Sequence, residues 1–120
     1  MTLSVALDDL RQHVERLGPA AFAVTAGSEG RPHVVSVAVG WDGDQLVFEA
    51  GNTTRGNVEA GGATTLLWPA PPCDAYSLIV DGEGRVGGAT VALTPGRAVL
   101  HRLVDAPGDG PSCVKLLPPP

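Results

Sequence analysis

The sequence predicts a mainly β protein of the α+β class, in which six antiparallel strands form a barrel preceded by one helix. Six short apolar runs follow one another and are bounded by Gly, Pro, Asn and Asp, the pattern of strands and turns. All but one of the connections between these runs are short, as antiparallel neighbours allow. The regular crossover helices that parallel strands need are missing from the pattern.

The first segment of the chain is predicted to be a helix. Its apolar residues recur at spacings of four, three, four and three, which places them on one helix face: Leu3, Leu7, Leu10, Val14 and Leu17. Gly18 and Pro19 follow directly and end the pattern.

From residue 20 onward the apolar residues come in runs. The predicted strands lie within residues 20–27, 32–40, 45–50, 63–68, 75–88 and 90–104. A short helix is expected at residues 54–60, after the third strand, and a bend at Pro95 and Gly96. The sequence therefore predicts a barrel domain over residues 1–104 and an irregular Pro- and Gly-rich tail over residues 105–120.

Several predicted strands are apolar on both faces, as in HVVSVAV and SLIV. A small barrel explains one buried face of these strands. A subunit interface explains the other, because large exposed apolar patches are uncommon on monomers.

Composition excludes several classes of function. The chain has eight basic and 13 acidic residues, for a net charge of −5. It therefore lacks the excess of positive charge expected of a protein that binds nucleic acid or an anionic membrane. No apolar run reaches about 18 residues, and the start of the chain lacks a basic stretch followed by an apolar one. We therefore expect no membrane span and a cytoplasmic location.

The cysteines and histidines indicate no metal site. Cys73 and Cys113 are far apart, and His13, His33 and His101 lack the spacing of metal ligands. In a reducing compartment the cysteines are expected to be free thiols. His33, at the start of a strand, is interpreted as an exposed strand-end residue.

GEGRVG, at residues 82–87, matches the GxGxxG pattern of dinucleotide-binding loops. That loop works only where a helix begins within it, so that backbone amides point at a pyrophosphate. Here β-like residues follow, broken by Pro95. The glycines are therefore interpreted as a bend or bulge in a strand.

GNTTRGN, at residues 51–57, carries more hydrogen-bonding groups than a turn requires. Thr53 and Thr54 offer hydroxyls and Arg55 a permanent charge, which together are the parts of a phosphate cradle. The same residues also fit a helix N-cap made by Thr53 or Thr54. Local spacing leaves both interpretations open.

The order of these segments resembles the pyridoxamine 5'-phosphate oxidase-like family of flavin-binding split β-barrels. The resemblance runs from about Leu3 to Val104 and rests on GRPHVVSVAV, a DG turn, LVFEA, GNTTRGN, ATTLLW and AYSLIVDG. It implies a split barrel that binds FMN, or alternatively the deazaflavin F420. It also implies a homodimer with cofactor sites at the subunit interface.

The resemblance assigns cofactor-binding positions. Val35, Ser36 and Val37 match the strand that borders the flavin ring and ribityl chain. Glu49 and Ala50 match positions that line the same cofactor. Thr53, Thr54 and Arg55 match the phosphate loop. Ser77 matches a polar residue that reaches the cofactor from the partner subunit.

This chain also departs from the family. Flavin-binding members often have two adjacent cations in the phosphate loop, whereas here Arg55 alone is charged. Arg31, Arg102 and Lys115 are the candidates to supply the missing charge. The long basic C-terminal segment of true pyridoxamine phosphate oxidases is missing, which argues against that reaction.

The resemblance implies an oxidoreductase that exchanges a hydride between FMN or F420 and a small organic substrate. The cofactor would carry the chemistry, so no catalytic side chain is nominated. Two alternatives stay open: a non-catalytic protein that binds a flavin or another planar ligand, and a dimeric barrel with a vacant pocket.

Overall fold

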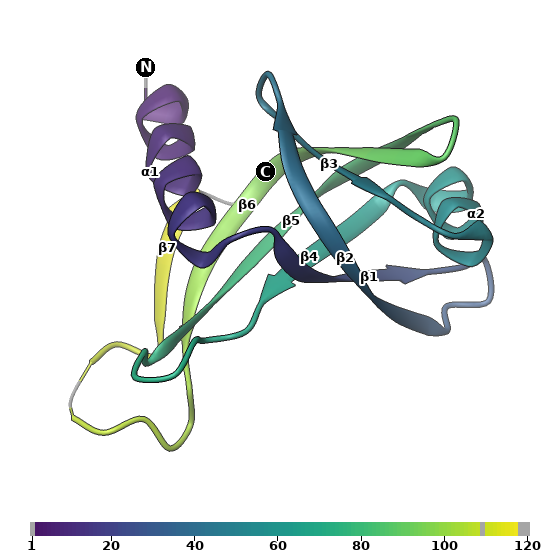
Figure 1. The fold of residues 1–120 in the computed structure, drawn as a ribbon. Coiled ribbons are helices and arrows are strands. Elements are labelled where there is room, and N and C mark those ends of the chain that lie inside the picture. Colours follow the sequence, from purple (N-terminus) through teal and green to yellow (C-terminus); the bar gives the residue numbers. More distant parts are fainter. Residues whose placement is uncertain (1, 109, 118–120) are drawn as a thin grey trace.

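The computed structural model describes residues 2–108 and 110–117, with side chains from Leu7 onward (Figure 1). Its elements are α1 (Thr2–Leu17), β1 (Ala20–Ala26), β2 (Pro32–Asp42), β3 (Gln45–Glu49), α2 (Asn52–Gly61), β4 (Ala63–Trp68), β5 (Tyr76–Gly87), β6 (Thr90–Arg102) and β7 (Cys113–Leu117).

Strands β1 to β6 form a closed antiparallel barrel. They pair in the order β3-β2-β1-β4-β5-β6, and β6 pairs back with β3, so that Leu46 lies opposite Leu93 and Phe48 opposite Val91. These four side chains are buried. The predicted six-stranded barrel, its leading helix and the helix after the third strand are confirmed.

The glycines of GEGRVG lie in β5, opposite a bulge in β6: Asp81 pairs with Arg97 and Gly82 with Pro95, so Gly96 is the extra residue. The β5–β6 register shifts at Gly82, where an added Cβ would overlap the carbonyl oxygen of Thr94. Nearby, at Pro95, strand β6 changes partner: it pairs with β3 up to Leu93 and with β7 from Ala98. GEGRVG thus lies in a strand and no helix starts here, as predicted, and the irregularity predicted at Pro95 and Gly96 is confirmed, but the bulge belongs to β6 and not to the glycines of β5.

The expectation of an irregular tail is wrong for Cys113–Leu117, which forms β7. The second half of β6 leaves its partner β3 and presents an open edge, and β7 pairs with that edge. Leu117 is buried in the core beneath α1. β7 is as long as β3 but lies among prolines and glycines, and only the open edge of β6 gives it a partner. The end of the predicted tail, residues 118–120, lies outside the described residues.

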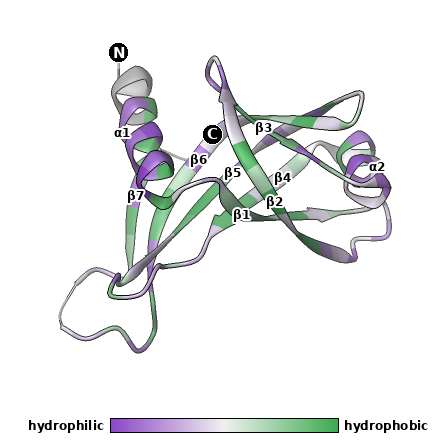
Figure 2. Cartoon of the chain, viewed as in Figure 1, coloured by the Kyte–Doolittle hydropathy of each residue, from purple (hydrophilic) through white to green (hydrophobic). Residues whose placement is uncertain are grey.

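Helix α1 covers one side of the barrel and β7 (Figure 1). Leu10 and Val14 are buried and Leu7 and Leu17 pack beside them, while the side chain of Leu3 lies outside the described part. Figure 2 shows hydrophobic residues along the central strands and largely hydrophilic helices. Neither helix, within the described residues, is long and apolar enough to cross a membrane.

A polar cluster ties α1 to the loop before β5. Arg16 forms an ion pair of 2.8 Å with Asp74 and donates a hydrogen bond to Nδ1 of His13 at 3.1 Å. Partial burial, and then the charge of Arg16, lowers the pKa of His13. The backbone N–H of Tyr76, and then Arg16, lowers the pKa of Asp74.

Candidate functional site

The barrel is split along one edge of β2. Residues 32–38 of β2 pair with β1, but β3 pairs with β2 only from Val39 to Asp42. Upstream of Val39, no strand in the described part of the chain pairs with this edge. Because the chain leaves β3 at Glu49 and enters α2 at Asn52, the start of α2 lies opposite the open edge. Backbone groups on that edge are available to a ligand.

A cavity of about 200 Å³ lies between this open edge and the start of α2. Seven of the nine predicted cofactor-binding residues line it: Val35, Ser36, Val37, Glu49, Ala50, Thr53 and Thr54. His33, Gly51 and Asn52 complete the lining. The structure therefore brings together two segments that the resemblance assigned to one cofactor.

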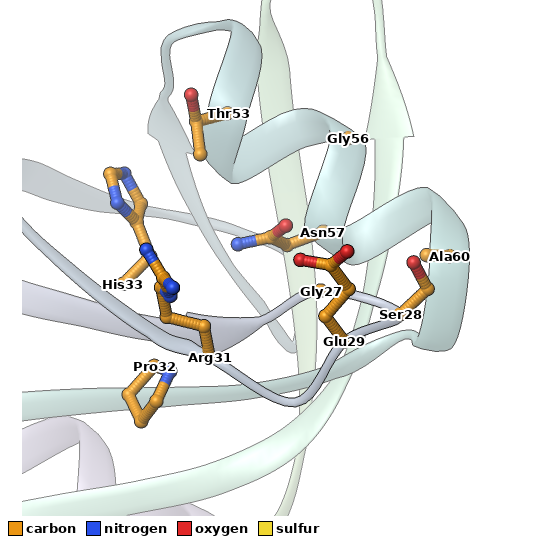
Figure 3. Close-up of a pocket in the computed structure, with 10 residues that line it drawn as sticks. All are labelled: Gly27, Ser28, Glu29, Arg31, Pro32, His33, Thr53, Gly56, Asn57 and Ala60. Atoms are coloured by element: carbon orange, nitrogen blue, oxygen red, sulfur yellow. The ribbon is translucent and has the colours of Figure 1, made fainter.

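A second cavity, of about 330 Å³, adjoins the first and shares His33 and Thr53 with it. It lies between the β1–β2 turn and α2, and its other lining residues are Gly27, Ser28, Glu29, Arg31, Pro32, Gly56, Asn57 and Ala60 (Figure 3). Asn57 fixes its wall, because the side-chain amide donates a hydrogen bond of 3.1 Å to Oγ1 of Thr25 on β1.

GNTTRGN forms the first turns of α2. Thr54 and Val58, four residues apart, are buried against the barrel, and the helix ends where Gly62, at φ 79°, donates its N–H to the carbonyl oxygen of Val58. The N-cap is Gly51, with no side-chain capping bond, so the interpretation of Thr53 or Thr54 as the cap is wrong. Thr53 is exposed to the cavities instead.

Two of the predicted residues lie away from the first cavity. Arg55 donates hydrogen bonds to the carbonyl oxygen of Gly88, at 3.1 Å, and to the side chain of Asn52. Ser77 is buried in β5, and its hydroxyl lies 3.3 Å from the carbonyl oxygen of His101. Within one chain, neither side chain joins the other seven.

His33 was missed as a site residue. It lies at the start of β2, as interpreted, but the expectation that it is exposed is wrong, because it is half-buried and lines both cavities. The hairpin register, with Ala26 opposite Pro32, brings the β1–β2 turn beside α2. The sequence showed only a turn at SEGR, and nothing local in it indicates that the turn faces a helix more than 20 residues later.

No family model matches the chain. Two relatives are the uncharacterized protein Mb0449c of Mycobacterium bovis and the uncharacterized protein MT0457 of Mycobacterium tuberculosis. Each is 34% identical, over 81% of this chain and 79% of the relative. The chain belongs to the family of these two mycobacterial proteins.

Solved structures of other proteins share the fold of this chain. A pyridoxamine 5'-phosphate oxidase-related, FMN-binding protein from Nostoc punctiforme matches with a TM-score of 0.62 at 13% identity, over 94% of this chain and 85% of its own. An F420 reductase matches with a TM-score of 0.58 at 16% identity, over 68% of this chain and 90% of its own. A heme-binding protein from Mycobacterium smegmatis matches with a TM-score of 0.63 at 13% identity, over 79% of this chain and 53% of its own. The chain thus has the pyridoxamine 5'-phosphate oxidase-like fold.

Proposed function

We propose that this chain binds FMN, or alternatively F420, along the open edge of β2 and uses it as an oxidoreductase acting on a small organic substrate. The observation that carries this proposal is the cavity that joins the open edge of β2 to the first turn of α2. Proteins of the same fold that are named as FMN-binding or as F420 reductase support it.

The residues present fit such a cofactor. The first cavity offers apolar surface from Val35, Val37 and Ala50 to a ring system, and the unpaired backbone of β2 offers donors and acceptors to its polar edge. Thr53 and His33 lead into the more polar second cavity. The second cavity, of about 330 Å³, falls within the range of about 300–1,000 Å³ that is typical of ligand pockets, and the first, of about 200 Å³, extends it.

When bound, the flavin or deazaflavin accepts or donates the hydride. The chain's own residues bind and orient the ring and keep water from the face that packs on β2. The described lining of the first cavity contains only Glu49 and His33 as titratable side chains. The protein's part in the proposed reaction is therefore to bind and position the reactants, while the cofactor carries the chemistry.

A second copy of this chain completes the site in this proposal. Phe22 of β1 is 39% exposed and Val34 of β2 is 57% exposed, on the outward face of the sheet. Ser36, which lines the first cavity, lies directly opposite Phe22 and so shares that face. A partner that covers Phe22 and Val34 would therefore also cover the mouth of the cavity.

The dimer has a direct test. Phe22→Glu should convert a dimer into a monomer in sedimentation analysis, because a charge would be buried at the interface. Val104→Glu is the matched control, since Val104 is fully exposed in the loop after β6. Equal behaviour of the two variants would contradict the dimer proposal.

Location in a reducing compartment is part of the proposal. Cys73 and Cys113 are both exposed and unpaired, a state that the cytoplasm preserves.

Cofactor binding is tested by titrating the cofactor-free protein with FMN and with F420 and following fluorescence. Ala50→Leu, which places a larger side chain in the first cavity, should weaken binding at least about tenfold. Ala92→Leu is the control, because Ala92 lines a groove on the β5–β6 hairpin. Failure of the wild type to bind either compound would refute the proposal.

The second candidate function is binding of a planar ligand without turnover. The lack of a catalytic acid or base beyond Glu49 and His33 in the first cavity favours it, as does the fold shared with a heme-binding protein. Electron transfer from NAD(P)H or reduced F420 to the bound cofactor supports the oxidoreductase. Tight binding without such transfer supports the second function, and no binding at all indicates a vacant barrel.

A further inference from the structure

The second cavity differs from the first in its charged lining. Arg31 and Glu29 come from the β1–β2 turn, and Thr53 and Asn57 from α2. In Figure 3, Arg31, His33 and Thr53 lie toward one end of the cavity, while Glu29, Ser28 and Ala60 lie toward the other. His33 and Thr53 are also the residues shared with the first cavity, so the basic end adjoins the proposed ring site.

The other candidate cations lie elsewhere. Arg55 holds the carbonyl oxygen of Gly88, in the β5–β6 turn, and the side chain of Asn52. Arg102 donates to three carbonyl groups of the loop after β6, at residues 106–108. Lys115 lies on the edge strand β7, opposite Val99. None of them lines either cavity.

Arg31 differs from all three because it lines the cavity. Unlike Arg55 and Arg102, its side chain also makes no ion pair or hydrogen bond within the described residues. Guanidinium groups bind phosphate through two parallel hydrogen bonds. Thr53, in the first turn of α2, adds a backbone N–H that has no partner within the helix, while its hydroxyl points away from Arg31 in Figure 3. The positive end of the helix dipole favours an anion at the same place.

We propose that Arg31, with His33 and Thr53, binds the phosphate of the cofactor where the two cavities meet. Arg55 is then a positioning residue that holds the start of α2 against the β5–β6 turn. Glu29, at the far end, repels the phosphate and keeps it at the junction. This inference rests on the proposed function, because it assumes that the cofactor ring lies along β2.

The test compares FMN with riboflavin, which has the same ring and no phosphate. Arg31→Gln should raise the Kd for FMN by about tenfold to a hundredfold and leave the Kd for riboflavin unchanged. Glu29→Gln should lower the Kd for FMN several-fold, again without effect on riboflavin. Arg85→Gln is the matched control, since Arg85 is exposed and lines two other grooves but neither of these cavities.

If F420 is the compound that binds, the same comparison uses F420 and its phosphate-free deazaflavin alcohol. Arg55→Gln should weaken the phosphorylated and phosphate-free ligands by the same factor. Far-UV circular dichroism verifies that each variant is folded.

The outcomes separate the two proposals. If the wild type binds none of the four compounds, the proposed function fails and this inference falls with it. If the wild type binds FMN but Arg31→Gln does not separate FMN from riboflavin, the cofactor proposal stands and the phosphate site at Arg31 is overturned. If Arg55→Gln is the variant that separates them, the phosphate lies at Arg55 and the inference is also overturned.

Discussion

Replacement of Gly82 by alanine should destabilise the barrel strongly. An added Cβ would overlap the carbonyl oxygen of Thr94, and would lie 2.9 Å from its carbonyl carbon and 3.1 Å from Cδ1 of Leu93. The first two atoms belong to the backbone of β6, so the clash cannot be relieved by a rotamer change. Overpacking costs typically 1–3 kcal/mol, and a backbone clash places Gly82→Ala at about 3 kcal/mol.

Thermal unfolding followed by circular dichroism measures this cost. For a domain of this size, about 3 kcal/mol lowers the Tm by roughly 12 °C. Gly87→Ala, in the same strand and the same GEGRVG segment, is the control, because no heavy atom lies within 4 Å of its added Cβ. Its backbone also lies outside the left-handed region, so the control should be neutral or stabilise by up to about 1 kcal/mol.

The two variants also distinguish a strand at GEGRVG from a dinucleotide-binding loop. A strand that carries no ligand predicts a large loss of stability for Gly82→Ala and little change in ligand affinity for either variant. The reasoning would be refuted if Gly82→Ala had the wild-type Tm, or if it lost ligand binding while remaining as stable as Gly87→Ala.

Two further predictions concern the attachment of α1. Trp68→Phe removes the hydrogen bond of 2.9 Å from the indole N–H to the carbonyl oxygen of Gly18, so urea unfolding should show a loss of about 1–3 kcal/mol. Because the folded-state pKa values of His13 and Asp74 are both lowered, the unfolded chain binds more protons, and stability should fall as pH decreases. The loss attributable to His13 begins below about pH 6.5 and should be absent in His13→Gln, whereas that of Asp74 begins below about pH 4. Because the Arg16–Asp74 pair is partly exposed, the loss of stability due to Asp74 should be less than about 1 kcal/mol. A free energy of unfolding that does not change between pH 7 and pH 3 would contradict the prediction.

Local patterns in the sequence predicted most of the barrel. The helical spacing of Leu10 and Val14 and the turn residues between strands act over a few residues, so they can be read without the fold. Strand β7 was missed because its stability comes from the open edge of β6, which only the closed barrel defines. Likewise, the start of α2 was placed two residues late because Gly51 caps it without a side chain.

The candidate site was predicted in part. Residues that follow one another along β2 and at the β3–α2 junction line the first cavity as expected, since the resemblance aligned whole segments. His33 was misinterpreted and Arg31 was not placed, because their environment depends on the β1–β2 turn meeting α2. The role of Ser77 depends on a partner subunit and stays a prediction.

The central claim is that a flavin-type cofactor lies between the open edge of β2 and the start of α2. Amide chemical shifts measured by NMR during addition of FMN or F420 test it most directly. We expect the largest shifts at residues 33–37 and 52–54, with little change in the β5–β6 hairpin around Gly84. Largest shifts in that hairpin, or no shifts with either compound, would contradict the account.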